Sequence, residues 1–406
     1  MTQRKRRCLK RGSRWGWIGI IGVAITLYLV FVQLPMVIDQ RLNAVMHSPP
    51  HAVSPAMAKV HNSLWIADLH ADSLLWHRDL SQRHPRGHVD LPRLQQANVA
   101  LQAFTVVTQI PSNLKLAGND SRSDDILKLA LIQRWPPSTW NSLLERALYQ
   151  AKQLQKLAAQ SSGEFRLVQT QADLQAFIQD RKQQPHLTAG ILGLEGVQAL
   201  QGRVENVDRI YAAGFRMLGL AHFFDTEVGG SVHGLRQGGL TALGRQVVLR
   251  SQQQHLLLDL AHSSPAVIDE VVAMSTQPVV VSHTGVQGTC NNLRNLSDSQ
   301  IRAIADTGGV IGIGFWFTAV CGEDAGAIAA AIRYTADLVG VNHVSLGSDF
   351  DGAVQMPFDV TGLPLITAAL QAEGFTPDEI GKIMGLNILR VLKTFCSLNI
   401  SSDYLQ

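Results

Sequence analysis

The sequence predicts an α/β fold, a (β/α)8 barrel of the TIM type, preceded by one N-terminal transmembrane helix. Eight short apolar segments rich in β-branched residues recur from about residue 64 onward, and helical patterns lie between most of them. This alternation is typical of parallel sheets. The body has about 340 residues, within the range of about 200 to over 400 for such barrels. A doubly wound open sheet is the alternative, but no GxGxxG follows the first segment.

The expected strands share an apolar, β-branched character. They are the segments 64–69, 101–108, 188–194, 215–221, 255–261, 279–282, 310–315 and 344–347. Helix starts between them carry capping signals, such as Ser264 before Pro265 and Thr376 before Pro377. The segment 165–168 is expected to form an extra strand in a long excursion between the second and third barrel strands.

The N-terminal segment has the pattern of a membrane anchor. The uncharged run from Gly16 to Ile38 exceeds the roughly 20 apolar residues that a bilayer requires. Basic residues ahead of it predict a cytoplasmic N-terminus. They are Arg4, Lys5, Arg6, Arg7, Lys10, Arg11 and Arg14. A cleaved signal peptide is the alternative, but its apolar region would be shorter, about 7–15 residues, and Gln33 and Pro35 offer no cleavage site.

These patterns divide the chain of 406 residues into five parts. They are a basic cytoplasmic N-terminus at 1–14, a transmembrane anchor at 15–38, a linker at 39–63, a catalytic barrel at 64–396 and a C-terminal tail at 397–406. The net charge of +3 arises mainly from the first part, so the remainder is close to neutral. A nucleic-acid partner is therefore not expected.

The cysteines do not form a disulfide framework. Cys290, Cys321 and Cys396 are odd in number and widely spaced on the far side of the anchor, while Cys8 precedes it. One bridge stays an open option. Because no cysteine pair has the spacing of a zinc ribbon, a metal would have to use histidines and carboxylates.

Residues that can bind metals follow most of the expected strands. His70 and Asp72 leave the first strand two positions apart, so their side chains point to one face. In a barrel all carboxyl ends of the strands lie at one face, where active sites are built. The later strands end in Glu195, His222, His262, His283 and Asp349. The sequence therefore predicts a metal-dependent active site.

The candidate donors are too many for one metal of the catalytic zinc type, which takes about three protein ligands plus water. They are His70, Asp72, Glu195, His262 and His283. Five donors suit two metals that share a bridging carboxylate. Ligation by nitrogen and oxygen without thiolate favours zinc, with manganese and iron as alternatives.

Taken together, these motifs resemble the membrane (renal-type) dipeptidases. The matching motifs are Asp-Leu-His70-Ala-Asp72, Gly-Leu-Glu195-Gly, Leu-Ala-His222, Asp-Leu-Ala-His262, Ser-His283, Arg294 eleven residues later, and Gly-Ser-Asp349-Phe-Asp-Gly. The resemblance runs from about residue 64 to 395. It implies a barrel of the metal-dependent hydrolase kind with two Zn²⁺ ions that hydrolyses dipeptides with a metal-bridging hydroxide. Cleavage of dipeptides with a C-terminal D-residue stays an open option.

The resemblance also implies a role for each metal ligand. His70 and Asp72 match the ligands of the first zinc, and His262 with His283 match those of the second. Glu195 matches the carboxylate that bridges both ions.

Three further residues match positions that act on the substrate. His222 matches a histidine that contacts the substrate and steadies the oxyanion, and Arg294 matches the arginine that binds the terminal carboxylate. Asp349 matches the acid that handles the proton of the attacking water and the leaving amine. Such a grip on the carboxylate would restrict cleavage to dipeptides.

The chain departs from the mammalian form of the family in two places. A glycine-rich loop around His233, a candidate for the rim of the pocket, replaces a Trp-containing stretch, which leaves the preferred dipeptides open. The tether is N-terminal, whereas mammalian members use a C-terminal lipid anchor. The N-terminal tether suits a single-pass protein of the bacterial inner membrane with a periplasmic catalytic domain, and the family implies a homodimer as one option.

Two other functions stay open at this point. One is a related barrel metallohydrolase that acts on another amide or a lactam, and the other is a catalytically inactive, membrane-tethered binding protein. Asp351 is expected to be a turn or supporting acid. The histidines of the linker and early loops are expected to be solvated: His47, His51, His61, His77, His84 and His88.

Overall fold

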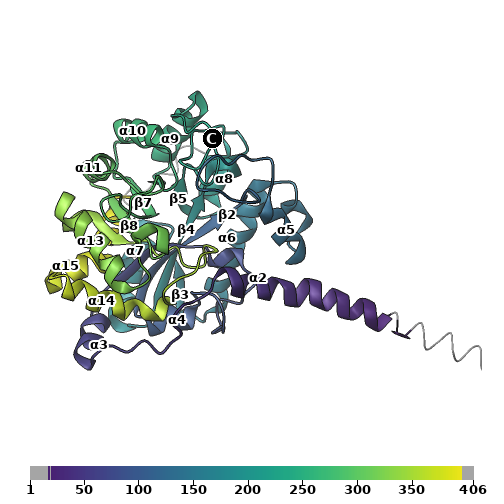
Figure 1. Cartoon of the computed structure of the whole chain (residues 1–406), viewed down its shortest axis with the longest axis horizontal. Coiled ribbons are helices and arrows are strands. Elements are labelled where there is room, and N and C mark those ends of the chain that lie inside the picture. The colour runs from purple at the N-terminus through teal and green to yellow at the C-terminus, as the bar shows by residue number, and fades with distance from the viewer. Residues whose placement is uncertain (1–16, 19, 396–406) are drawn as a thin grey trace, which may run out of the picture.

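The fold is a closed barrel of parallel strands with helices outside it (Figure 1). The computed structural model describes residues 17–18 and 20–395; the basic segment 1–14, Cys8, Cys396 and the tail 397–406 lie outside this range. The barrel strands are β1 (Ile66–Ala71), β2 (Val99–Val107), β4 (Thr188–Glu195), β5 (Phe215–Gly219), β6 (Leu257–Asp259), β7 (Val280–Thr284), β8 (Val310–Ile313) and β9 (Val344–Leu346). Pairing of β2 with β4 and of β9 with β1 closes the ring. The predicted barrel and its eight strands are confirmed.

The additional strand β3 (Phe165–Leu167) lies in the excursion between β2 and β4, as expected. It pairs with the first residues of β4, Phe165 opposite Thr188. Helices α6 (Leu143–Gln160) and α7 (Gln171–Gln183) flank it. The excursion therefore adds to the wall of the barrel without interrupting its closure.

The helices begin where the sequence has capping residues. Ser264 accepts a hydrogen bond from the backbone of Val267, and Thr376 forms a capping box with Glu379. The remaining helices of the barrel domain are α4 (Leu91–Gln96), α5 (Asp125–Ile132), α8 (Asn206–Ala212), α9 (Ala242–Gln253), α10 (Pro265–Met274), α11 (Asp298–Asp306), α12 (Phe317–Val320), α13 (Ala325–Val339), α14 (Leu363–Ala372), α15 (Pro377–Gly381) and α16 (Asn387–Phe395).

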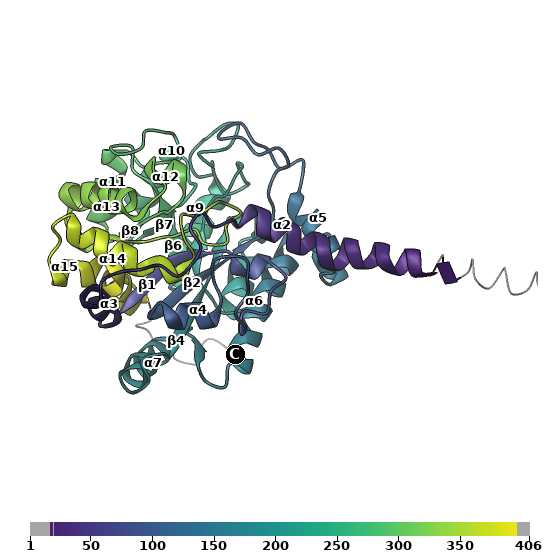
Figure 2. The ribbon, with the colours of Figure 1, turned by 60° about the horizontal axis from the view of Figure 1, so that its bottom comes forward.

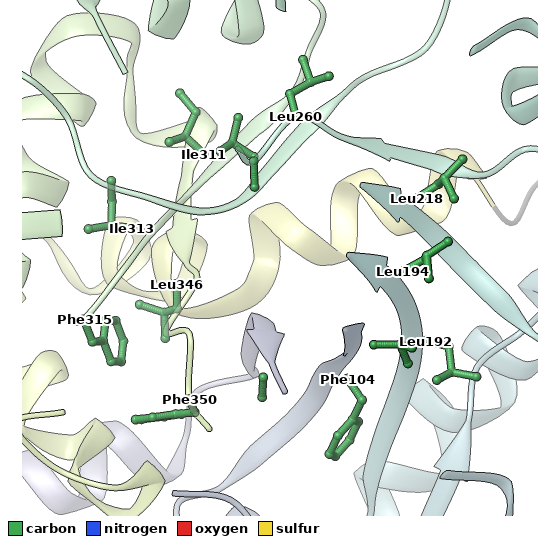
Figure 3. Close-up of a cluster of buried hydrophobic side chains, with 14 of the residues drawn as sticks. Phe104, Leu192, Leu194, Leu218, Leu260, Ile311, Ile313, Phe315, Leu346 and Phe350 are labelled. Atoms are coloured by element: carbon green, nitrogen blue, oxygen red, sulfur yellow. The ribbon is translucent and has the colours of Figure 1, made fainter. Parts of the chain in front are cut away.

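The hydrophobic core has two main parts. The larger part includes side chains two apart on a strand, such as Leu192 and Leu194 of β4, which pack with the surrounding helices (Figure 3). The second part joins side chains from the first residues of most strands, such as Ala189 and Val280, to Ile388 of α16. These residues fill the amino end of the barrel, which leaves the carboxyl end free to hold polar groups.

The N-terminal helix Ile20–Leu42 is long and apolar enough to cross a membrane, and helices of this kind also occur as signal sequences. It projects from the barrel in both views (Figures 1 and 2). Its last part, α2 (Leu34–Leu42), does not project, because Pro35 and Asp39 are buried against the domain.

The segment 39–63, expected as a linker, is packed on the barrel. It contains helix α3 (Pro55–Asn62), and Val45 forms a β-bridge with Met356. The prediction that the early histidines are solvated is wrong for His61 and His88, which are buried, and for His51, whose side chain is 4% exposed beside Asp359. His61 Nδ1 lies 2.8 Å from Thr367 Oγ1, a contact between residues 306 positions apart that no local pattern reveals.

Cys290 and Cys321 form a disulfide. The sequence left one bridge open without identifying the pair. The bond joins the loop after β7 to the C-terminal end of α12, so it closes one side of the mouth of the barrel.

Candidate metal centre and substrate pocket

The predicted site residues meet in one pocket at the carboxyl end of the barrel. The pocket has a volume of about 300 Å³ and is lined by Asp72, Glu195, His222, His262, His283, Arg294 and Asp349, together with apolar side chains. His70 is fully buried beneath these residues. Segments from residue 70 to residue 349 are thus brought to a single point.

Glu195, the last residue of β4, is the centre of the cluster. Its Oε2 lies 3.6 Å from His70 Nε2. Its Oε1 lies 3.1 Å from His262 Nε2 and 3.5 Å from His283 Nε2. His222 Nε2 is 3.6 Å from the same oxygen. One carboxylate therefore faces imidazoles on both sides.

Three groups of three side chains bring their ligand atoms within 4.8 Å of one another. They are His70 with Glu195 and His283, Glu195 with His222 and His262, and His70 with Asp72 and Asp349. The sequence predicts that His222 and Asp349 act on the substrate. In the structure, however, their side-chain ligand atoms lie within 4.8 Å of those of predicted metal ligands. Their positions are therefore compatible with metal ligation as well as with contact to a substrate.

Ser282 orients two of the imidazoles. Its Oγ lies 3.0 Å from Nδ1 of His70 and 2.9 Å from Nδ1 of His283, which turns both Nε2 atoms toward Glu195. Thr105 in β2 donates a hydrogen bond of 2.6 Å to Asp72 Oδ1. Such partners fix ligand orientation in metal sites. Neither role is predicted from the sequence, although the position of Ser282 directly before His283 is a usable signal.

Two residues of the site have unusual backbone angles, and a buried aspartate, Asp68, supports the backbone beside one of them. His262 and Asp349 have left-handed φ angles of +61° and +65°, which are rare for non-glycine residues and often mark functional sites. Asp68, a buried aspartate of β1, is not among the residues that line the pocket. Its carboxylate instead accepts bonds from the backbone and hydroxyl of Ser348, both 2.7 Å, directly before Asp349.

The electrostatics of the site fit bound cations. Burial, helped by the charge of Asp72, raises the pKa of Glu195 to about 7. Burial also raises the pKa of Asp349 well above its usual value, and it lowers the pKa values of His262 and His283 far below theirs. Neutral imidazoles are the form that binds metals, and a divalent cation offsets the cost of burying the carboxylates.

The nitrogen atoms of the site lead to the same conclusion. Nε2 of His70 is buried and has no hydrogen-bond partner among the residues that the structure describes. Nε2 of His262 and Nε2 of His283 lie 2.9 Å apart, facing one another. Lone pairs arranged in this way are satisfied by a shared proton or by a cation. The donor set therefore fits divalent metal ions.

Arg294 supplies a positive wall to the pocket. Its Nη2 donates a hydrogen bond of 2.8 Å to the backbone oxygen of His283, and its guanidinium carbon lies 5.7 Å from the ring centroid of Trp316. Burial lowers the pKa of Arg294 to about 10, so the group remains a cation at neutral pH. Trp316, which the sequence analysis did not identify, forms the adjoining wall.

The glycine-rich loop predicted at the rim lies over His222 and His262. Val232 donates a backbone bond of 2.9 Å to the oxygen of His262. His233 is buried and lines the pocket, and its Nδ1 lies 2.7 Å from the oxygen of Leu116. The expectation that this loop forms part of the pocket is confirmed.

The chain is similar to known proteins along most of its length. Residues 55–402 match the model of the membrane dipeptidase family, peptidase family M19. An uncharacterized dipeptidase of Schizosaccharomyces pombe is 27% identical over 327 residues, 78% of this chain and 75% of the relative. An uncharacterized protein from the pqqA 5′ region of Klebsiella pneumoniae is 32% identical over 256 residues, 59% of this chain and 92% of the relative.

A solved structure has the same architecture. It is a metallopeptidase from Rhodobacter sphaeroides liganded with a phosphinate mimic of the dipeptide L-Ala-D-Ala. It is 25% identical with a TM-score of 0.68, covering 81% of this chain and 99% of that chain. Since the family model spans most of the sequence, this chain belongs to the membrane dipeptidase family of metallopeptidases, peptidase family M19.

Proposed function

We propose that this metallodipeptidase works with two zinc ions at the mouth of the barrel. His70 and Asp72 would hold the first ion, His262 and His283 the second, and Glu195 would bind both. The position of Glu195 between imidazoles on its two sides, 3.1–3.6 Å from its oxygens, is the observation that carries the proposal. Ligands without thiolate favour zinc among the common metals.

The remaining residues would handle charge and protons around the scissile bond. Bound zinc supplies Lewis acidity toward the peptide carbonyl and lowers the pKa of water. Asp349, whose carboxyl group is buried at the pocket wall, would take a proton from the attacking water and pass it to the leaving amine. His222, kept neutral by burial, would donate a hydrogen bond to the developing oxyanion.

Arg294 would select the length of the substrate. A buried guanidinium can bind a carboxylate through two hydrogen bonds. Because Arg294 lines the same pocket as the ligand cluster, a substrate held in this way would have only one residue beyond the scissile bond. We include dipeptides with a C-terminal D-residue among the substrates, because the related Rhodobacter sphaeroides metallopeptidase was solved with a mimic of L-Ala-D-Ala.

The N-terminal helix would anchor the enzyme to a membrane with the barrel on the far side. Basic residues before the helix favour a cytoplasmic N-terminus. The Cys290–Cys321 disulfide fits an oxidising compartment such as the bacterial periplasm. The homodimer implied by the family stays a prediction.

The direct test is a dipeptide panel assayed with the full chain in detergent. We expect hydrolysis that a chelator abolishes and that added zinc restores. Hydrolysis that survives complete removal of metal would contradict the proposal. Failure of the zinc-loaded protein to cleave any dipeptide would instead favour the alternatives of another amide or lactam substrate, or of an inactive binding protein.

Replacement of Arg294 by Ala tests the proposed grip on the carboxylate. We expect KM for a dipeptide to rise about 30- to 150-fold, because a hydrogen bond to a charged group contributes about 2–3 kcal/mol. The matched control is Arg302→Ala, which alters an exposed arginine of α11. Steady-state kinetics with a dipeptide and its C-terminal amide measure the effect. An unchanged KM would favour the hydrolase of another amide.

A further inference from the structure

The loop after β9, residues 348–357, is held in an unusual conformation. We call it the mouth loop. It carries Asp349, and Gly352, Ala353 and Val354 within it line the pocket. Three of its non-glycine residues have left-handed φ angles: Asp349 at +65°, Asp351 at +62° and Ala353 at +58°. Such residues are costly and persist only where the surrounding structure enforces them.

Contacts with the end of the N-terminal helix help to hold the mouth loop in this conformation. Pro35, Asp39 and Asn43 are four residues apart, so they lie on one helix face, and all three are buried. Asn43 Oδ1 accepts a hydrogen bond of 3.0 Å from the backbone N–H of Ala353. Met356, further along the loop, exchanges backbone bonds of 2.9–3.0 Å with Ala44 and Met46. Figure 2 shows α2 lying against the domain at this point.

A series of buried ion pairs connects Asp39 to Asp351, a residue of the mouth loop two positions after Asp349. Asp39 Oδ2 lies 2.8 Å from Arg86 Nε and 3.3 Å from Arg78 Nε. Arg78 Nη2 lies 2.7 Å from Asp351 Oδ2, and neither the Arg78 nor the Asp351 side chain is exposed. Charges paired away from water interact strongly, and removing one leaves the others uncompensated.

Hydrogen bonds fix both the side chain and the backbone of Asp351 within the mouth loop. Its Oδ1 accepts a hydrogen bond of 2.6 Å from the backbone N–H of His88, and its Oδ2 accepts one of 2.6 Å from Ser73. Its own backbone oxygen accepts a bond of 2.7 Å from the indole N–H of Trp76. The side chain and the main chain of Asp351 are thus both fixed, two residues from Asp349.

We propose that Asp39 is a positioning residue for catalysis. The end of the N-terminal helix fixes the conformation of the mouth loop, which carries Asp349. It does so through the ion pairs of Asp39 with Arg78 and of Arg78 with Asp351, and through the hydrogen bond of Asn43. The inference rests on the proposed function. It also goes beyond the family, because residues 34–54 precede the matched range 55–402. The helix is then more than a tether, since it forms part of the scaffold of the pocket.

The test uses the full chain in detergent with two variants, Asp39→Asn and Asn43→Ala. The control is Gln40→Ala, which alters an exposed residue of the same helix. We expect kcat to fall about ten- to 100-fold for Asp39→Asn, since displacement of a catalytic group by about 1 Å can cost about 100-fold. KM should stay within about twofold, because the contacts of Arg294 are untouched. A smaller fall in kcat is expected for Asn43→Ala.

Hydrogen exchange of the mouth loop, followed by mass spectrometry, gives a readout that does not depend on activity. We expect faster exchange at 348–357 in both variants and unchanged exchange in the control. Should the wild type cleave no dipeptide, the proposed function fails, yet the exchange result still decides whether the helix holds the loop. Variants with control-like exchange in the loop, or with wild-type kcat per folded molecule, would overturn the inference.

Discussion

Replacement of Glu195 by Gln is expected to lower kcat at least about 1,000-fold. Among the carboxylates that the structure describes, Glu195 alone has imidazole nitrogens within 3.6 Å of both its oxygens. Glutamine keeps the shape and removes the negative charge, so both proposed metal positions lose a ligand. Kinetics and metal analysis of the purified variant measure the loss. Glu205→Gln, at an exposed position, is the matched control.

The same variant should stabilise the metal-free protein. Burial raises the pKa of Glu195 to about 7, above the value of about 4.3 in an unfolded chain. The folded state therefore retains a proton that the unfolded state has released, and this contribution to stability is lost as pH rises through about 7. We expect the metal-free Tm of Glu195→Gln to exceed that of the wild type by a margin that grows from about pH 5 to about pH 8. Equal Tm values, or kcat within about tenfold of wild type, would contradict this view of Glu195.

Replacement of Asp349 by Asn is expected to lower kcat about 100- to 10,000-fold while metal content stays unchanged. The substitution removes the group that would carry the proton, and asparagine tolerates the left-handed φ of +65° at this position. KM should change little because Arg294 remains. Steady-state kinetics beside metal analysis separate the two effects.

The control for this variant is Asp306→Asn, an exposed aspartate of α11. A variant of Asp349 that keeps more than about a tenth of wild-type kcat would argue against proton transfer by this residue. A variant that loses metal together with activity would make Asp349 a ligand, a role that its distance of 3.9 Å from His70 Nε2 also permits.

The features predicted well from the sequence have local causes. Each barrel strand is a short β-branched segment, and residues that close parallel strands must meet at one face of a barrel. That rule alone brings His70, Glu195 and His283 together from positions more than 200 residues apart. The extra strand at 165–168 and the capping residues Ser264 and Thr376 were predictable for the same reason.

The features that were missed depend on contacts between distant segments. His61 lies in the segment expected as a linker and His88 among polar residues and prolines, yet the tertiary fold buries both. Asp39 looks like the first charged residue after a membrane span, and nothing near it in the sequence indicates Arg78 as its partner. The pairing of Cys290 with Cys321 likewise requires the mouth of the barrel to be assembled first.

The central claim is that one carboxylate, Glu195, holds two metal ions. Anomalous diffraction at the zinc absorption edge, from crystals of the zinc-supplemented full chain, measures this directly. Two peaks about 3.5–4 Å apart are predicted, one beside His70 and Asp72 and the other beside His262 and His283, with Glu195 between them. A single peak, or peaks away from Glu195, would contradict the account.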